Sequence, residues 1–345
     1  MNNRKTYIIP FFIPFNGCPH KCIYCNQNLI TGFSSKRPSR EKMFTYFDNY
    51  LSFSKKTHKN VEIAFFGGTF LGMDNQKIIY FLESAKKFAS FHPDINFEIR
   101  FSTRPDTITD TSIDLLKNYP ISTIELGIQS MDDYVLKKSG RGHTAEDSRK
   151  ACHLIRTKRP DINLGLQFMP GLPGETNDSI NKIFDFLNEI IPDYLRIYPT
   201  VVLKDTALET LFNKNQFTPL SLEKAVEISS RIYDLSAELG IKVIRMGLPS
   251  EVSKENIIVS GPWHPSFGEL VMQKSIYQKI KNYLEKIDDL KDKTVSFSIN
   301  PSSESLFRGW KNSTVKNIKQ KFAVCDIKFQ KDKSMAKDDF LINVI

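Results

Sequence analysis

The chain has 345 residues, of which 40% are hydrophobic, and a formal net charge of +9. This length allows one large domain or two, because single hydrophobic cores stop growing near about 250 to 300 residues. Pro10 and Pro14 interrupt the apolar run near the N-terminus, so we expect no membrane span, no signal peptide and a cytoplasmic protein. The basic charge by itself gives only a weak preference for polyanionic partners.

Residues 7–14 form the first predicted strand, which leads into three cysteines within eight residues: Cys18, Cys22 and Cys25. A CxxxCxxC loop can wrap three thiolates around one 4Fe-4S cluster, and without a fourth ligand nearby one iron stays open. Zinc is the main alternative, although a structural zinc site normally needs four ligands and commonly a second CxxC pair. A disulfide framework is typical of short secreted chains and fits poorly. Cys152 and Cys325 are isolated, and we expect both to be small buried hydrophobic residues.

Further apolar strands follow the cysteine loop and alternate with predicted helices. Their approximate ranges are 61–69, 96–103, 123–130, 163–169, 194–202 and 241–245. Continuously apolar strands separated by helices indicate a parallel sheet covered by helices. About six such units predict an α/β fold of the partial (β/α)6-barrel type, with chemistry at the C-terminal ends of the strands. A doubly wound sheet is the alternative, but no Gly-x-Gly-x-x-Gly follows the first strand to cradle a dinucleotide phosphate.

Unusual residue clusters fall where these strands are predicted to end. Gly67 and Gly68 let the backbone approach a ligand closely, although a plain turn also explains a lone Gly-Gly pair. We expect Asp106 and Thr144 to be helix N-caps. The Pro- and Gly-rich stretch 167–176 is either one wall of a ligand pocket or a tight turn between strand and helix, and the two interpretations are compatible.

The cysteine spacing, with the aromatic Tyr24 before its last cysteine, resembles the cluster motif of the radical S-adenosylmethionine (SAM) superfamily. The resemblance implies that Cys18, Cys22 and Cys25 hold a 4Fe-4S cluster whose open iron binds SAM. It also implies contacts to SAM from the loop and from the ends of the strands. The residues concerned are Tyr24, Gly67, Gly68, Thr69, Ser102, Thr103, Gln129, Arg141, Met169 and Gly171.

Each of these contacts follows from a motif of the superfamily. Residues 67–69 match a GGE motif that contacts the methionyl amino group, with threonine in place of the glutamate. Residues 102–103 match hydroxyl positions that contact the ribose or the carboxylate. Gln129 is assigned to the ribose, and Arg141 to the carboxylate, which a guanidinium fork can bind through two hydrogen bonds. Residues 169–171 are assigned to the wall of the adenine pocket.

Four longer motifs narrow the resemblance to the radical SAM half of the catalytic subunit of Elongator, the complex that modifies the wobble uridine of tRNA. They are residues 67–70, 196–200, 243–248 and 261–271, the last with the run Gly-Pro-Trp-His-Pro. The resemblance implies a radical SAM core over residues 1–275, an RNA substrate such as tRNA, and a flavodoxin- or ferredoxin-type electron donor. The Elongator subunit also carries an acetyltransferase domain, for which the remaining residues are too few, so we expect a different fate for the product.

Two other functions stay open from the sequence. The chain can be a cluster-bearing redox or RNA-binding regulator that never cleaves SAM. It can also be a radical SAM enzyme that acts on a small metabolite or a peptide. Reductive cleavage of SAM distinguishes the regulator from the enzyme, and copurifying nucleic acid would narrow the substrate class.

Residues 276–345 are predicted to form a small basic α+β domain. Residues 291–345 carry 11 Lys or Arg against 6 Asp or Glu, and so contribute +5 of the net charge. Residues 309–318 resemble the KH loop GxxGxxIxxI that clamps a nucleic-acid backbone, with Asn312 in place of the second glycine. An N-capped amphipathic helix with its apolar side turned inward is the alternative interpretation.

Overall fold

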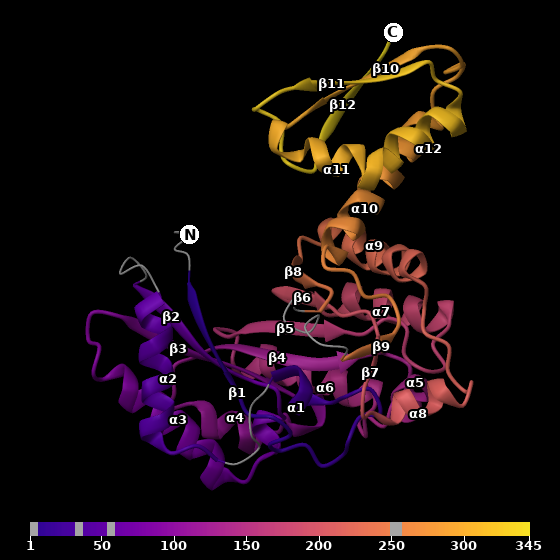
Figure 1. The fold of residues 1–345 in the computed structure, drawn as a ribbon. Helices are drawn as coiled ribbons and strands as arrows, with labels where there is room; N and C mark the ends of the chain where they lie inside the picture. The colour runs from indigo at the N-terminus through magenta and orange to yellow at the C-terminus, as the bar shows by residue number, and fades with distance from the viewer. Residues whose placement is uncertain (1–5, 32–36, 54–58, 249–256) are drawn as a thin grey trace.

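The computed structural model describes residues 6–31, 37–53, 59–248 and 257–345. Its main feature is a sheet of seven parallel strands whose spatial order follows the chain (Figure 1). The strands are β1 Tyr7–Phe12, β2 Asn60–Phe66, β3 Asn96–Thr103, β4 Ile121–Gln129, β5 Asn163–Phe168, β6 Tyr194–Ile197 and β8 Lys242–Met246. The predicted partial barrel is confirmed.

Helices that pack into the main core cover one face of the sheet. They are α2 Arg40–Phe53, α3 Asn75–Ala89, α4 Asp110–Leu116, α6 Ala145–Lys158, α7 Asn177–Glu189 and α9 Leu222–Glu238. The short helices α1 Gln27–Thr31, α5 Asp133–Lys138 and α8 Ala207–Asn213 also lie in the connections between strands. A crossover between parallel strands is almost always right-handed, so an order that never reverses places the crossover helices on the same side. A doubly wound sheet needs a reversal of strand order, which the described strands do not have.

The sheet curls so strongly that strands far apart in it meet across the inner face. The Arg196 guanidinium on β6 lies 5.7 Å from the centre of the Phe66 ring on β2. Strands β3, β4 and β5 separate the two in the sheet, and a flat sheet would hold them about 19 Å apart. The face without helices is therefore the inside of a half-barrel.

Alternation along each strand decides which residues face the helices and which face the inside. On β3, the side chains of Phe97, Ile99 and Phe101 belong to the main hydrophobic core. Arg100 and Ser102 alternate with these residues along the strand and therefore point to the inner face. The same rule places one row of side chains from every strand inside the half-barrel.

The main core fills the space between the sheet and its helices. At its centre the Phe70 ring lies 5.3 Å from the Phe65 ring and 4.7 Å from the Phe101 ring, measured between ring centres. All three side chains are completely buried. Burial of one phenylalanine contributes roughly 1.5 to 3 kcal/mol. This stack therefore fixes the C-terminal ends of β2 and β3, where the predicted site residues begin.

Of the two predicted helix caps, one is confirmed and the other is wrong. The Thr144 hydroxyl caps α6 by accepting from the Asp147 N–H at 3.1 Å, and the Asp147 carboxylate accepts from the Thr144 N–H at 2.8 Å. Asp106 caps no helix. It lies inside a short 3-10 turn that begins at the proline before it, and it forms an ion pair with Arg104. Thr109 caps α4 instead.

The C-terminal unit, residues 285–345, is a three-stranded sheet backed by two helices. Its elements are β10 Thr294–Ile299, α11 Glu304–Arg308, α12 Ser313–Phe322, β11 Asp326–Lys331 and β12 Phe340–Val344. The central strand β10 is parallel to β11 and antiparallel to β12. Phe297, Phe307 and Ile318 belong to a hydrophobic core of this unit, separate from the main core.

Helix α10, Phe267–Leu284, joins this unit to the half-barrel (Figure 1). Near its start, Val271 packs into a cluster with residues of α9. Near its end, Ile280 packs into the core of the C-terminal unit. The boundary predicted between residues 275 and 276 thus falls inside one continuous helix, and the division into two domains stays a prediction.

Short elements and one cysteine differ from the sequence expectations. The helices α1, α5, α8 and α11 were not predicted, nor was the antiparallel pair β7 Val202–Leu203 and β9 Ile258–Ser260. Cys152 is buried as expected, whereas Cys325 is exposed, so that expectation was wrong. Cys325 directly precedes β11, an edge strand that neighbours cover on one side only. Within the described ranges, none of the helices is long and apolar enough to span a membrane.

Candidate functional site

The cysteine loop lies against the C-terminal end of β2. The Ile13 N–H donates to the Phe66 carbonyl at 2.7 Å, and the Thr69 N–H donates to the Asn16 carbonyl at 2.8 Å. A Cβ atom at Gly68 would lie 2.5 Å from the Asn16 oxygen, so any side chain there would push the loop away. The backbone of the cysteine loop is therefore what approaches Gly68 closely, and a contact between this glycine and SAM stays a prediction.

The three loop cysteines influence one another. All three are half-buried. Burial, together with the neighbouring Cys22 and Cys18, raises the pKa of the Cys25 thiol to about 12. The Cys18 sulfur also lies 3.3 Å from the Thr69 hydroxyl. No group of three or more His, Cys, Asp or Glu side chains in the described part of the chain converges as it would around a single metal ion.

Arg141 is a buried cation that faces this loop. Its Nη1 donates to the Cys22 sulfur at 3.4 Å, and its Nη2 donates to the Gly127 carbonyl. Only 7% of the residue is exposed, and its Nε has no hydrogen-bond partner among the described residues. Gln129 ends β4 with a φ of 71°, which is uncommon outside glycine and clusters at functional sites. A Cβ atom at Gly127 would lie 2.9 Å from the Gln129 amide nitrogen and 3.1 Å from Arg141 Nη2, so the glycine leaves room for both side chains.

Tyr24 and Met169 lie next to the cysteines. Both belong to one hydrophobic cluster that also contains Cys22 and Cys25. Burial raises the pKa of Tyr24, and its hydroxyl has no hydrogen-bond partner in the described ranges. The end of β5 is thus brought to the loop that follows β1, as the predicted site requires.

Three further predicted residues are Ser102, Thr103 and Gly171. Ser102 is half-buried on the inner face. The Thr103 hydroxyl accepts from the Leu71 N–H at 3.2 Å and lies 2.7 Å from the Thr107 hydroxyl, so it already serves the protein. Gly171 borders a separate cavity of about 420 Å³ beside α7 and α9. The structure therefore brings most of the predicted residues together around the cysteine loop, with Gly171 turned toward another space.

The family model of the radical SAM superfamily matches residues 12–187, and that of the radical SAM C-terminal domain matches residues 192–278. The chain belongs to the radical SAM superfamily. The superfamily uses a 4Fe-4S cluster and SAM.

Individual relatives of this radical SAM protein point to the Elongator branch. The tRNA uridine(34) acetyltransferase of Methanocaldococcus infernus is 28% identical over 291 residues, which cover 74% of this chain and 53% of that protein. Elongator complex protein 3 of Mus musculus is 28% identical over 193 residues, which cover 51% of this chain and 35% of that protein. The chain therefore spans about half the length, or less, of these curated relatives.

A solved structure shares the fold. The archaeal Methanocaldococcus infernus Elp3 has a TM-score of 0.60 at 21% identity, over 81% of this chain and 63% of that one. At this identity the likeness concerns the fold alone. The curled parallel sheet described above is thus the radical SAM half-barrel, together with its extension toward the C-terminus.

The residues at the loop fit the cofactors of a radical SAM protein. Iron-sulfur clusters are held by cysteine thiolates, and the three loop cysteines share one half-buried environment. Cys152 lies in the main core and Cys325 in the C-terminal unit, so neither belongs to the loop. The unpartnered Nε of Arg141 is a buried donor that a carboxylate of SAM would satisfy.

The inner face of the half-barrel also carries a network of charges to which the sequence analysis gave no role. The Arg100 Nε lies 3.4 Å from a Glu62 oxygen and 3.6 Å from a Glu125 oxygen. The Arg196 Nε lies 2.8 Å from the other Glu125 oxygen. The sequence did contain a signal for this network. One of these charged residues lies in each of the strands β2, β3, β4 and β6, and period-two alternation can place them on one face.

Glu175 is a second residue that the sequence analysis missed, at the cavity beside α7 and α9. One carboxylate oxygen accepts from the Gly171 N–H at 2.6 Å, and the other has no partner among the described residues. Burial raises the pKa of this carboxyl group to about 8. Glu175 is thus largely protonated at neutral pH and stabilises the turn that follows β5.

Proposed function

We propose that this radical SAM enzyme acts on tRNA and that its target nucleoside is a uridine. The observation that carries the enzymatic part is the contact between Arg141 and Cys22, which places a buried cation beside the cysteine loop. The substrate part rests on the similarity to a tRNA uridine(34) acetyltransferase over 74% of this chain. The net charge of +9 favours a polyanionic partner.

The cluster and SAM, when bound, supply reductive cleavage of SAM to methionine and a 5′-deoxyadenosyl radical that removes a hydrogen atom from the substrate. The chain itself binds and orients the reactants. Cys18, Cys22 and Cys25 hold the cluster, Arg141 pairs with the carboxylate of SAM, and Gln129 contacts its ribose. The inner-face side chains of Glu62, Arg100 and Glu125 are buried, which limits the access of water to this surface.

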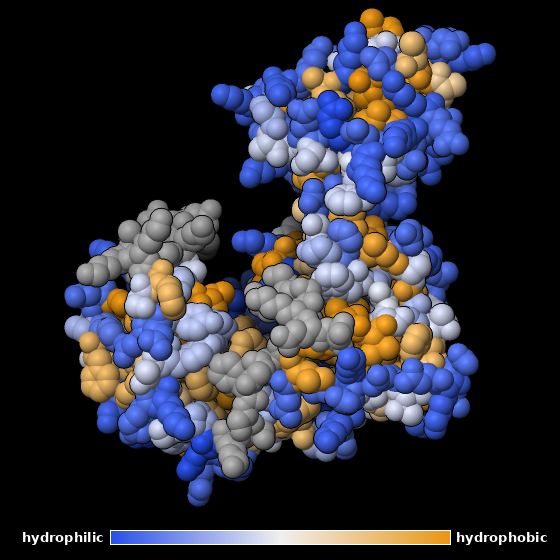
Figure 2. Space-filling model, in the orientation of Figure 1, coloured by the Kyte–Doolittle hydropathy of each residue, from blue (hydrophilic) through white to orange (hydrophobic). Residues whose placement is uncertain are grey.

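The electron comes, in this proposal, from a small flavodoxin- or ferredoxin-type protein, and the reaction takes place where tRNA is found, in the cytoplasm. We further propose that residues 1–275 form the catalytic domain and residues 276–345 a second, basic domain. The second domain extends from the half-barrel on α10 and presents polar side chains over much of the face seen in Figure 2.

The turn between α11 and α12 supports a role of the C-terminal unit in RNA binding. In the chain order, the two helices come between the paired parallel strands β10 and β11, and residues 309–312 join one helix to the other. The Trp310 N–H donates to the Gln273 side chain at 2.8 Å, and the Trp310 ring lies 5.7 Å from the His264 ring. The turn is therefore tied to the Gly-Pro-Trp-His-Pro segment of the half-barrel, while the Lys311 side chain is exposed.

A labelling experiment tests the proposal. Protein reconstituted with iron and sulfide without oxygen is reduced with dithionite in the presence of SAM and of tRNA that carries deuterated uridine. We expect 5′-deoxyadenosine that contains deuterium, detected by mass spectrometry. If no 5′-deoxyadenosine forms although the cluster is intact, the protein is a regulator. If 5′-deoxyadenosine forms without deuterium and in the same amount without tRNA, SAM cleavage is not coupled to tRNA, and tRNA is not the substrate.

A further inference from the structure

Trp310 is an exposed aromatic side chain on a firmly held turn. Although 54% of the residue is exposed, it directly precedes two residues with positive φ in the turn between α11 and α12. Single exposed hydrophobic side chains are common on protein surfaces and by themselves indicate nothing. Trp310 differs from such residues, because its backbone and its ring both have neighbours from a distant part of the chain.

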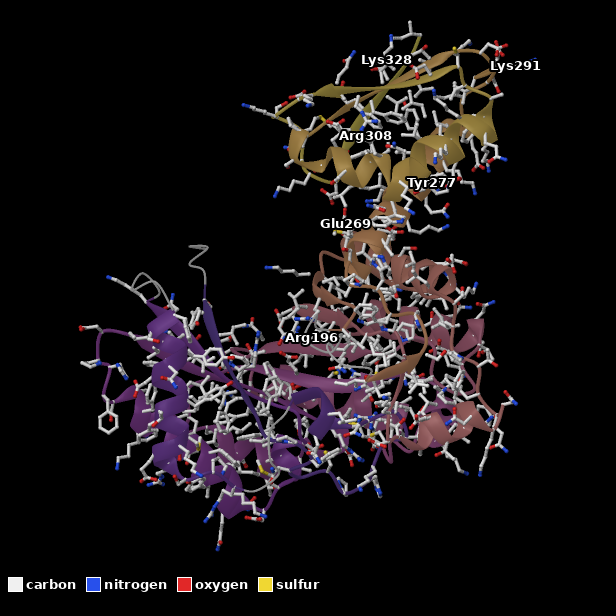
Figure 3. All side chains as sticks on the ribbon, in the orientation of Figure 1. Arg196, Glu269, Tyr277, Lys291, Arg308 and Lys328 are labelled. Carbon is white, nitrogen blue, oxygen red and sulfur yellow. The ribbon has the colours of Figure 1, made fainter. Side chains whose placement is uncertain are left out.

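Gln273 holds the backbone of Trp310. The Gln273 side-chain oxygen accepts from the Trp310 N–H at 2.8 Å, and the Gln273 Nε2 donates to the Glu269 carboxylate at 3.3 Å. Gln273 is only 7% exposed, and these two bonds satisfy both of its polar atoms. Figure 3 shows Glu269 on α10, where this helix leaves the half-barrel toward the C-terminal unit. The turn is therefore anchored on the helix that joins the two parts.

His264 holds the ring of Trp310. The two ring centres lie 5.7 Å apart, and the ring planes are inclined at 81°. This edge-to-face geometry is one of the arrangements that aromatic pairs prefer. The contact therefore orients the indole ring, while more than half of the residue remains accessible to a ligand.

The backbone of the turn adopts conformations that its surroundings must impose. The φ angles of Gly309, Lys311 and Asn312 are 73°, 51° and 60°. Such angles are uncommon outside glycine, and they are retained mainly where a structure serves a ligand or a switch. A Cβ atom at Gly309 would lie 2.5 Å from the Thr314 hydroxyl oxygen, so only glycine fits there. The turn is thus held in a shape that presents the indole ring instead of burying it.

The surroundings of the Trp310 ring are basic. The Lys311 ammonium lies 6.0 Å from the ring centre, and Lys316 is exposed in the first turn of α12. Among the described residues neither of these lysines forms an ion pair, whereas Lys319 and Lys321 are each paired with a carboxylate. An accessible ring beside unpaired cations suits a ligand that combines flat rings with phosphates. Single-stranded RNA has this chemistry.

We propose that the Trp310 ring stacks on an unpaired base of the RNA, with Lys311 and Lys316 on the phosphates next to that base. This inference rests on the proposed function and adds a contact that a backbone clamp alone does not supply. Figure 1 shows that the C-terminal unit extends away from the half-barrel, so the stacked base is a second one, distinct from the target base. Every base has a flat face, so the contact anchors the RNA without selecting a particular base.

Tryptophan fluorescence of the full chain tests the stacking contact. The chain has two tryptophans, Trp263 and Trp310, so Trp263→Phe leaves Trp310 as the only reporter. The reconstituted variant is titrated with a tRNA transcript and, separately, with an RNA duplex of the same length without unpaired bases. We expect tRNA to quench the Trp310 emission strongly and the duplex to leave most of it. Equal quenching by the two RNAs, or none with tRNA bound, would overturn the proposal.

The affinity for tRNA provides a second measurement. Trp310→Ala is expected to weaken binding about 5- to 150-fold, the range for the loss of one stack between a base and an aromatic ring, and Trp310→Phe should lose less. The loss should be the same at every salt concentration, because stacking releases no counterions. Tyr283→Ala is the matched control, since Tyr283 is an aromatic residue of α10 that is 47% exposed. This control should bind tRNA like the wild type.

The possible failures are distinguishable. Circular dichroism and the iron content of each variant should match the wild type, because the substituted side chains are exposed. If tRNA transfers deuterium to 5′-deoxyadenosine and Trp310→Ala still binds tRNA as tightly as the wild type, the stacking contact is wrong while the proposed function stands. A loss in Trp310→Ala that vanishes at high salt would also overturn the stacking contact. If the wild type binds no tRNA, the proposed function fails and the stacking contact fails with it.

Discussion

Arg141 and Cys22 lie 119 positions apart in the chain, yet the Arg141 Nη1 donates to the Cys22 sulfur at 3.4 Å. An arginine side chain stays charged in proteins, and a buried charge is costly unless an opposite charge is near. Thiolates of the cysteine loop provide that opposite charge when they hold a metal cluster, because metal ligands are deprotonated. The contact therefore links the stability of the buried cation to cluster binding.

Arg141→Gln is expected to weaken SAM binding to the reconstituted protein by about 10- to 150-fold. Hydrogen bonds to charged groups contribute roughly 1.5 to 3 kcal/mol, which corresponds to this range. Calorimetric titration with SAM measures it. Arg141→Lys keeps the positive charge but not the forked guanidinium. Its affinity for SAM should therefore lie between those of the wild type and Arg141→Gln. Arg156→Gln, which removes a surface ion pair with Asp193, should bind SAM like the wild type. Unchanged affinity in Arg141→Gln would remove Arg141 from the site.

Substitution of any loop cysteine should abolish the cluster, because the chain has no spare thiol beside the loop. Cys18→Ala, Cys22→Ala and Cys25→Ala are each expected to lose the brown absorbance and the bound iron after reconstitution without oxygen. Cys152→Ala and Cys325→Ala should keep both. Iron and sulfide analysis with visible absorption measures the outcome. A fully loaded Cys22→Ala protein would contradict the assignment of the three ligands.

The repeating strands and helices could be predicted from the sequence, because burial on both faces leaves continuous apolar runs. The predicted strand at residues 96–103 coincides with β3, and the predicted strand at 163–169 ends one residue after β5. The pair β7 and β9 could not be predicted in this way. Each has two or three residues and exists only because the chain brings residues 202 and 260 together. Such elements depend on tertiary contacts rather than on local pattern.

Within the site, motifs located the residues but not their surroundings. The cysteine spacing and Arg141 could be named from the sequence by resemblance. The positive φ of Gln129 could not be predicted from the sequence, because glutamine has no preference for that conformation. The contact between Arg196 and Phe66 depends on the curl of the whole sheet, which no local window contains. For the same reason the inner charges were not recognised as one network.

Phe101→Ala should destabilise the protein by about 3 to 5 kcal/mol, the usual cost of removing a fully buried phenylalanine ring. Phe101 stacks on Phe70 at 4.7 Å in the centre of the core, so the loss leaves a cavity beneath the ends of β2 and β3. Urea unfolding followed by circular dichroism measures the change. Phe53→Ala is the control, because Phe53 is 80% exposed and its loss should change stability by less than about 0.5 kcal/mol.

Glu175 should make the protein less stable as the pH rises from about 5 to 9. Burial raises the pKa of its carboxyl group from 4.5 to about 8, so the folded state binds a proton that the unfolded state has already released. The free energy of unfolding therefore falls with pH across this window. Glu175→Gln keeps an acceptor for the Gly171 N–H and cannot ionise. The variant should gain stability over the wild type at pH 8 and little at pH 5.

Urea unfolding at both pH values tests this dependence on Glu175. Glu238→Gln, at an exposed position of α9, serves as the control and should change stability equally little at either pH. A wild type and a Glu175→Gln variant with the same pH profile would mean that the carboxyl group ionises normally in the folded protein.

The turn at Lys311 and Asn312 provides the last prediction. Both residues have positive φ angles, 51° and 60°, and both side chains are exposed. Aspartate tolerates this conformation better than most residues, so Lys311→Asp with Asn312→Asp should preserve the turn while it reverses the local charge. A KH-like clamp brings backbone and basic groups onto phosphates. We therefore expect this pair to weaken tRNA binding at least about tenfold and to reduce its salt dependence.

The matched control places the same kind of charge change elsewhere on the C-terminal unit. Lys333→Asp with Lys337→Asp alters two exposed lysines outside the turn. This control reverses even more charge than the turn pair, since Asn312 carries none. If binding depends only on the summed charge of the unit, the control pair must therefore lose at least as much affinity as the turn pair in titrations at fixed salt. A larger loss in the turn pair indicates a specific contact at residues 309–312, whereas equal or smaller losses would indicate a diffuse basic surface.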